Sequence, residues 1–409
     1  MSEKRILSLE KLKRFCNEIF ENPSSYSSLT ELNLLRSNLG AIGLCILAET
    51  LEKHPTALVS LLELDLSYSN LEGVRLKALA NILKILSSLQ SLHLGGNNLR
   101  SGDLNVIAET LEKQSFTLSS LRILYLSNNE LGNGGLDSLV RVLERLPFLQ
   151  ELYLSSNELG SGGLDTLARA LERHPTIFSS LRKFYLSGNH LGKVGLDTLA
   201  RALEKHPTAL SSLYEFNISC NEFGRYGLNA FMKALEIPTI LPSLQILNLS
   251  SNNLGRGGLN ALAETLERKP TVLSSLRELY LDDNNLGRDG IGALVRTLEN
   301  HPTAFSFLRK LNLYYNQLGK TGVRAFRDAN EKVLQRTFGR QSILPRCKNF
   351  DLTKCWKLQF LPKFLDCYSK VTQNEILAIW LMFRREKKKS LSSFLPPEII
   401  TLICSELIR

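Results

Sequence analysis

Leucines recur along the chain in a fixed pattern, and residues 149–180 show one full period of it. The segment opens with L-x-x-L-x-L-x-x-N-x-L at Leu149, Leu152, Leu154, Asn157 and Leu159. Leucines that alternate with polar or aromatic residues predict a short, half-buried strand. After a glycine-rich stretch, Leu164, Leu167, Ala168 and Leu171 have the spacing of one helix face, and Pro175 ends the predicted helix.

The pattern occurs ten times, at spacings of 28 to 32 residues. The repeats open at Leu29, Leu61, Leu89, Leu121, Leu149, Leu181, Leu213, Leu244, Leu276 and Leu308. A single strand and helix cannot cover their own apolar side, so the units must stack into an array. An asparagine recurs in eight repeats, at Asn97, Asn129, Asn157, Asn189, Asn221, Asn252, Asn284 and Asn316. We expect it to bond open backbone groups of the adjacent turn.

This motif, followed by a full helix, resembles the leucine-rich repeats of the ribonuclease-inhibitor subfamily. Such repeats also occur in intracellular immune receptors, in the Ran GTPase-activating protein and in secreted effectors of intracellular bacteria. The resemblance covers residues 29–338. It implies an α/β solenoid, a curved horseshoe with a parallel sheet on the concave side and helices on the convex side. A fold of this kind hosts many unrelated activities, so function needs other observations.

The two ends of the chain depart from the repeat. Residues 5–21 read as a helix with Leu12, Phe15, Cys16 and Ile19 at the places of repeat helix residues. We therefore predict that residues 1–28 are half a repeat, without its strand, and cap the first repeat. Residues 339–409 read as a small, basic, all-α domain.

The net charge of +10 is concentrated at one end of the chain. Residues 1–318 hold 32 Lys and Arg against 32 Asp and Glu, whereas residues 319–409 hold 18 against 8. The neutral repeats argue against the role of ribonuclease inhibitor, because basic ribonucleases would need an acidic partner. The basic run from Arg384 to Lys389 is interpreted as a solvated helix end, so nucleic acid is not an expected partner.

Seven cysteines form no C-x-x-C pair, which favours a reducing compartment, the cytosol of the cell that makes the protein or of a host. The charged N-terminus contains no apolar core of a secretory signal. The most apolar run, residues 376–383, is too short to cross a bilayer, so no transmembrane segment is predicted.

Two motifs that suggest chemistry have simpler explanations. The phrase H-P-T recurs at His54, His174, His206 and His301. Histidine complements the dipole at a helix end, and the following proline stops the helix. Gly319-Lys320-Thr321 lacks the first glycine of a phosphate-binding loop, since position 314 is a tyrosine. We therefore predict no catalytic residue, metal or cofactor.

The residue between the two strand leucines should point out of the concave sheet. It is tyrosine in three consecutive repeats, at Tyr125, Tyr153 and Tyr185, and again at Tyr280, while Tyr68, Tyr314 and Tyr315 lie in neighbouring positions. Adjacent strands would place the three about 5 Å apart as an exposed aromatic row. Two interpretations remain open: a partner-binding surface, or good strand residues that pack on one another.

Residues 395–407, LPPEIITLICSEL, resemble the opening of an F-box. The resemblance implies docking on a Skp1-type adaptor through Leu395, Pro396, Glu398, Ile399 and Ile403. The alternative is a final amphipathic helix that packs on its own domain.

Together these features predict a non-enzymatic scaffold that binds a partner protein on the concave face, and a host-directed effector is one form of it. Two alternatives are a substrate receptor of a ubiquitin ligase and a Ran-type GTPase activator. Against the activator, no repeat loop singles out one arginine with supporting polar residues. The sequence predicts neither the partner's identity nor the oligomeric state.

Overall fold

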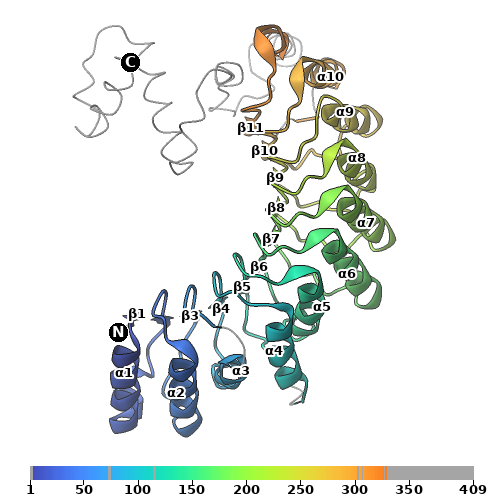
Figure 1. The fold of residues 1–409 in the computed structure, drawn as a ribbon. Coiled ribbons are helices and arrows are strands. Elements are labelled where there is room, and N and C mark those ends of the chain that lie inside the picture. Colours follow the sequence, from blue (N-terminus) through green and yellow to red (C-terminus); the bar gives the residue numbers. More distant parts are fainter. Residues whose placement is uncertain are drawn as a thin grey trace, which may run out of the picture. The chain divides into compact units, whose positions relative to one another are not determined.

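The computed structural model describes residues 3–71, 75–113, 117–301, 304–305, 307–326 and 328. The chain divides into two compact units, Met1–Trp356 and Lys357–Arg409, and the described residues all belong to the first. The predicted domain at residues 339–409, with its F-box-like segment, lies outside them. Within the first unit, strands and helices alternate along the chain (Figure 1).

Each described strand has three residues. The strands are β1 (Glu3–Arg5), β2 (Glu31–Asn33), β3 (Glu63–Asp65), β4 (Ser91–His93), β5 (Ile123–Tyr125), β6 (Glu151–Tyr153), β7 (Lys183–Tyr185), β8 (Glu215–Asn217), β9 (Ile246–Asn248), β10 (Glu278–Tyr280) and β11 (Lys310–Asn312). They form one parallel sheet in chain order. The middle residue of β2 to β11 is buried and the outer two are mostly half-buried, as alternation along a strand requires.

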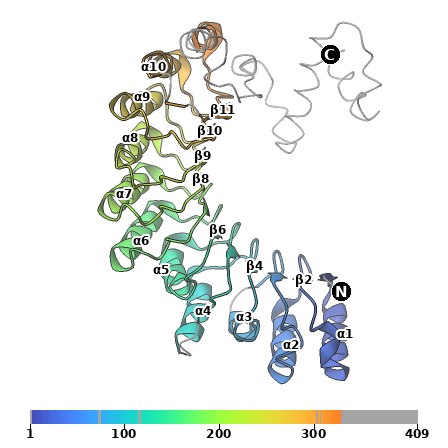
Figure 2. The same ribbon diagram turned by 180° about the vertical axis from the view of Figure 1, so that it is seen from behind.

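A helix follows each of the first ten strands. The helices are α1 (Leu9–Glu21), α2 (Gly40–Lys53), α3 (Arg75–Ile85), α4 (Ser101–Lys113), α5 (Gly132–Leu143), α6 (Gly160–Arg173), α7 (Gly192–Lys205), α8 (Gly224–Ala234), α9 (Gly258–Arg268) and α10 (Gly287–Asn300). Residues 319–326 are also helical. The helices line the outside of an arc and the strands its inside (Figures 1 and 2). Packed helices are wider than paired strands, so the array curves toward the sheet, and the predicted solenoid is confirmed.

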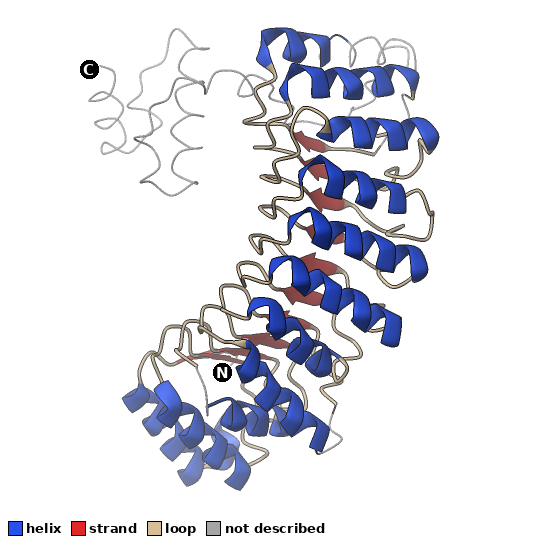
Figure 3. Ribbon diagram, turned by 45° about the vertical axis from the view of Figure 1, so that its right-hand side comes forward, coloured by secondary structure: helices blue, strands red, loops and turns tan. Residues whose placement is uncertain are grey.

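The core lies between these two layers, and Figure 3 shows the strands as one column behind the helices. Leucines from both layers fill it; Leu152 and Leu154 of one repeat and Leu164 of its helix are fully buried. Four helices end at the histidines of the H-P-T phrase, since His54, His174, His206 and His301 are the C-caps of α2, α6, α7 and α10. The interpretation of this phrase as a helix end is confirmed.

The N-terminal cap differs from the prediction. Residues 3–5 form β1, which pairs in parallel with β2, so the cap has a strand and its helix begins only at Leu9. Lys4 of β1 stands in register with the buried Leu32, and its ammonium donates to the Tyr26 hydroxyl over 3.0 Å. The sequence Glu-Lys-Arg carries no apolar alternation, so it does not predict a strand. A lysine held by Tyr26 thus takes the strand position that an apolar residue occupies in β2.

The recurring asparagines form a ladder that links one repeat to the next. Asn221 is fully buried, and its amide nitrogen donates to the carbonyls of Leu186 (2.9 Å) and Ile218 (3.2 Å). Its Oδ1 accepts the backbone N–H of Asn189 over 2.9 Å. The predicted role of the asparagines is thus confirmed. At Asn157 the ladder is incomplete, because its buried Oδ1 finds no hydrogen-bond partner in the described part of the chain.

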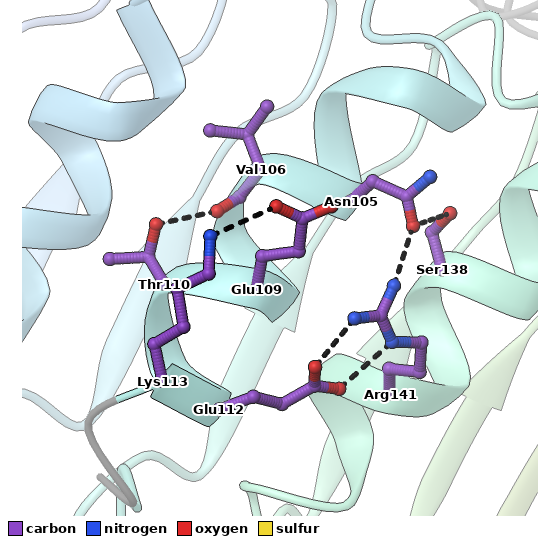
Figure 4. A network of polar contacts seen from close by, with 8 residues as sticks. All are labelled: Asn105, Val106, Glu109, Thr110, Glu112, Lys113, Ser138 and Arg141. Carbon is purple, nitrogen blue, oxygen red and sulfur yellow. Dashed lines mark hydrogen bonds and ion pairs between the residues drawn. The ribbon is translucent and has the colours of Figure 1, made fainter.

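The outer helices are joined by polar contacts as well as by packing. Arg141 of α5 donates to Glu112 over 2.8 Å and to Asn105 over 3.0 Å, both on α4 (Figure 4). Ser138 donates to the same Asn105 oxygen over 2.9 Å. This network fixes two neighbouring repeats on the convex side, away from the sheet.

Candidate partner-binding surface

The concave face is built from the first and third residues of each strand, which flank the buried middle residue. In-line register places equivalent residues side by side along the sheet. Tyr125 therefore stands opposite Tyr153, and Tyr153 opposite Tyr185. We call Tyr125, Tyr153 and Tyr185 the tyrosine row. Its position follows directly from the constant register of the repeats.

The rings of the tyrosine row stack on one another. The ring centroids of Tyr125 and Tyr153 are 4.9 Å apart, and those of Tyr153 and Tyr185 are 4.6 Å apart. His93 extends the stack beyond Tyr125, at 5.8 Å. The rings are half-buried rather than exposed, because neighbouring rings cover their faces. The row thus packs on itself and presents its edges to solvent.

Glutamates bind the hydroxyl groups of three concave tyrosines. Tyr153 donates to Glu151 over 2.7 Å, Tyr280 donates to Glu278 over 2.5 Å, and Tyr185 donates to Glu215 of the next strand. Burial and then these carboxylates raise the pKa of Tyr153, Tyr185 and Tyr280 above the usual range of a phenol. Each phenol is therefore a fixed hydrogen-bond donor to its glutamate.

Of the other predicted aromatics, Tyr68 lies near the N-terminal end of the row. Tyr68 is exposed, and the Arg36 guanidinium lies over its ring at 5.3 Å. Tyr68 covers Gly96, and a Cβ on Gly95 would come within 2.9 Å of the Tyr125 ring. This glycine pair lets both rings lie against the backbone, and it joins Tyr68 to the tyrosine row.

Tyr280 is separated from the row by Asn217 and Asn248, which fill the same position on β8 and β9. Beyond it, Tyr314 is half-buried and Tyr315 is exposed. The structure therefore brings Tyr68, Tyr125, Tyr153 and Tyr185 together. It places Tyr280, Tyr314 and Tyr315 in a second group toward the C-terminal end of the sheet.

The concave face is acidic although the repeats as a whole are neutral. The first and third strand positions of the described sheet hold seven carboxylates and three cations: Glu3, Glu31, Glu63, Asp65, Glu151, Glu215 and Glu278 against Arg5, Lys183 and Lys310. A charge count over the whole repeat array misses this surplus. Counting by strand position would have found it, because the compensating cations lie elsewhere in each repeat.

The surplus is densest at the N-terminal end of the sheet. Glu3, Glu31 and Glu63 stand in register on β1, β2 and β3, and we call them the glutamate column. Burial, and then the charges of Glu3 and Glu63, raise the pKa of Glu31 above its usual value. Like charges on adjacent strands repel, so this column costs stability.

Comparison with known proteins agrees with this architecture. Six segments of the chain, residues 117–140, 145–168, 179–200, 241–263, 272–295 and 306–326, match the family described as "Leucine Rich repeat". The fold is a leucine-rich-repeat solenoid. No curated protein sequence matches the chain.

Three solved structures are similar to this chain at low sequence identity. The leucine-rich repeat-containing protein LegL7 from Legionella pneumophila is 18% identical, with 86% of this chain and 99% of that chain covered and a TM-score of 0.43. An internalin (InlF) from Listeria monocytogenes is 17% identical, with 72% and 79% covered and a TM-score of 0.40. TLR13 in its ssRNA13 complex is 19% identical, with 70% and 39% covered and a TM-score of 0.37.

Leucine-rich repeats of this kind indicate a protein-interaction scaffold, and the matches indicate no enzyme family. Among the described residues, no helix has the length and apolarity that a membrane span needs. The predicted adaptor-docking residues, Leu395, Pro396, Glu398, Ile399 and Ile403, lie outside the described residues.

Proposed function

We propose that this protein is a non-enzymatic scaffold that holds a partner protein on the concave face of its leucine-rich repeats, centred on the tyrosine row. The stacked, half-buried rings of Tyr125, Tyr153 and Tyr185 carry the proposal. Tyrosines that are already ordered lose little freedom when a partner binds, and tyrosine is enriched among the residues that dominate binding energy. Tyr68, Tyr280, Tyr314 and Tyr315 would supply peripheral contacts.

An alanine scan along the concave face tests this proposal. The partner is first captured on the full-length protein from a eukaryotic lysate, and its affinity is then measured for single variants. We expect Tyr125→Ala, Tyr153→Ala and Tyr185→Ala each to weaken binding by about 2 kcal/mol or more. Asn33→Ala and Asn312→Ala, at the same strand position but far from the row, are the controls. Equal and small effects at all five positions would refute a site centred on the row.

The source of the captured partner tests whether the scaffold is a host-directed effector. An effector that acts in a host cytosol should capture a partner from a eukaryotic lysate and none from a bacterial lysate. Capture of the same class of partner from both lysates would leave the scaffold function intact and reject the effector role.

A second proposal concerns the F-box-like segment at residues 395–407. Its motif supports a substrate receptor in which the repeats hold the substrate and Leu395, Ile399 and Ile403 dock on a Skp1-type adaptor. Ile399→Asp with Ile403→Asp would place two charges against an apolar groove, at a large desolvation cost. A pull-down with a Skp1-type protein should succeed with the wild type and fail with this double variant. A wild-type protein that recovers no adaptor rejects the ubiquitin-ligase function.

A further inference from the structure

The tyrosine–glutamate pairs of the concave face have a fixed polarity. A phenol has a single donor hydrogen, and in Tyr153, Tyr185 and Tyr280 that hydrogen is given to a glutamate of the protein. The phenol lone pairs and the remaining carboxylate capacity can only accept hydrogen bonds. A group that binds such a pair must therefore bring donor hydrogens, and a positive charge matches the carboxylate.

One of these concave pairs already holds a cation from the protein itself, and a pair in the N-terminal cap does the same. Lys310 donates to the Tyr280 hydroxyl over 2.8 Å and lies 4.6 Å from the centre of its ring, while Tyr280 donates to Glu278. At the N-terminal cap, Lys4 donates to the hydroxyl of Tyr26, which in turn donates to Glu18. The same three-part arrangement of cation, phenol and carboxylate thus occurs at both ends of the sheet.

The pair formed by Tyr185 and Glu215 has no such cation among the described residues. The candidate on the adjacent strand is Lys183, which stands in register between Glu151 and Glu215. Its ammonium is 2.9 Å from Glu151, and it forms no ion pair with Glu215. Lys183 therefore serves Glu151 alone, and among the described residues the Tyr185 hydroxyl is the side-chain partner of the Glu215 carboxylate.

The geometry points to a docking position for one cationic side chain of the partner protein, at Tyr185 and Glu215. This inference rests on the proposed function and deepens it, because it specifies the partner as a segment bearing an arginine or lysine. The acidic surplus of the whole concave face favours the same partner and repels phosphate backbones. The docking position lies where the tyrosine row ends and the shorter Asn217 and Asn248 begin, which leaves the Tyr185 ring without an aromatic neighbour on that side.

The test is an NMR titration of the full-length protein with carbon-13 in the tyrosine rings. The ring signal of Tyr185 is assigned from its absence in Tyr185→Phe. The probe is the capped peptide Gly-Gly-Arg-Gly-Gly, and the comparison peptide carries neutral citrulline in place of arginine. We expect the arginine peptide to shift the Tyr185 signal with saturation and the citrulline peptide to leave it unchanged. No shift, or equal shifts with both peptides, would overturn the inference.

Two variants with the same change in charge locate the effect. Glu215→Gln keeps an oxygen that accepts from Tyr185 but removes the charge, so we expect about tenfold weaker binding of the arginine peptide. Glu264→Gln, at an exposed position of α9 on the convex side, should bind as the wild type does. Equal binding by wild type and Glu215→Gln would contradict the assigned site.

A third variant should create a second site. Lys310→Gln removes the internal cation from Tyr280 and Glu278, so the arginine peptide should then also shift the Tyr280 signal. An unchanged Tyr280 signal in this variant would show that a vacant pair does not bind cations.

Binding of the partner captured for the alanine scan distinguishes two claims: that the partner binds on the concave face, and that it places a cationic side chain at Tyr185 and Glu215. Loss of its binding in Tyr153→Ala but not in Glu215→Gln would keep the concave site and reject the cation. No loss in either variant would reject both.

Discussion

The N-terminal strands β1 to β3 and the central strands β5 to β7 share one backbone register but carry opposite interactions on their concave side. In the first region, Glu3, Glu31 and Glu63 repel one another. In the second, Tyr125, Tyr153 and Tyr185 stack at 4.9 and 4.6 Å. The register is the same in both because buried apolar residues occupy the middle position of every strand from β2 onward. The first and third residues of each strand, which point outward, can therefore vary without changing the fold, and they can carry binding functions.

If the buried scaffold sets the fold, damage to it should have the largest effect. Deletion of residues 1–24 removes the fully buried side chains of Leu12, Phe15 and Ile19, and uncovers the apolar surface on which they pack. Each large apolar side chain contributes about 1.5 to 3 kcal/mol. We expect the array to fray from β2 onward, visible as faster amide exchange in the repeat that opens at Leu29. Unchanged exchange and solubility would contradict the capping role.

The asparagine ladder offers a matched pair of scaffold variants. Asn221→Ala removes two amide donors and also the oxygen that accepts from Asn189, whereas the corresponding oxygen of Asn157 has no partner to lose. A buried N–H without an acceptor costs about 1 to 3 kcal/mol. In urea unfolding, Asn221→Ala should therefore be less stable than Asn157→Ala by that amount. Equal stabilities would indicate that the ladder is complete at Asn157.

Changes to the outward positions should have smaller effects on stability. Tyr153→Ala loses ring contacts on both sides, while in the described part of the chain no aromatic ring stacks on Tyr280. Aromatic pairs contribute about 0.5 to 1.5 kcal/mol beyond their buried area, so Tyr153→Ala should destabilise its repeat more than Tyr280→Ala does. Local opening free energies from hydrogen exchange would measure the difference. The reverse order would show that stacking does not stabilise the row.

The glutamate column should give the smallest effect, with an unusual dependence on pH. Because the pKa of Glu31 is raised in the fold, its destabilising charge is absent below the usual carboxyl pKa and is fully present above the raised value. The pKa of Glu112 is lowered by the hydrogen bond from Arg141, so its stabilising contribution is lost as the pH falls through the lowered value.

Acidification from neutral pH should therefore raise the local stability of β1 and β2 relative to that of α4 and α5. After correction for the intrinsic exchange rate, amide protection in the two regions should change in opposite directions. Glu31→Gln should remove the effect at β1 and β2 and add a few tenths of a kcal/mol of stability. Parallel changes in the two regions would show that repulsion within the column is negligible.

The solenoid could be predicted from the sequence because the pattern of leucines and asparagines recurs along the chain. Constant spacing of leucines within the strand motif fixes the register, and register alone places Tyr125, Tyr153 and Tyr185 side by side. The strand β1 was not readable, because Lys4 stands where the other strands have an apolar residue. Its role depends on Tyr26 and Glu18, which are distant in the sequence.

The chemistry of the concave face was only partly readable. The glutamate partner of Tyr153 comes from its own strand and that of Tyr185 from the next strand, so no fixed spacing identifies both. The burial of the rings also depends on how closely they stack, which spacing does not reveal. The acidic surplus is invisible in the net charge of the repeats, because cations at other positions of each repeat balance the carboxylates of the strands.

Hydroxyl-radical footprinting of the full-length protein, with and without its captured partner, tests the central claim most directly. The exposed Tyr226 on α8 is the internal reference, because it belongs to the outer helix layer. We predict that the partner lowers oxidation of Tyr68, Tyr153 and Tyr185 and leaves Tyr226 unchanged. Protection of Tyr226 with unchanged oxidation of the concave tyrosines would contradict binding on the sheet.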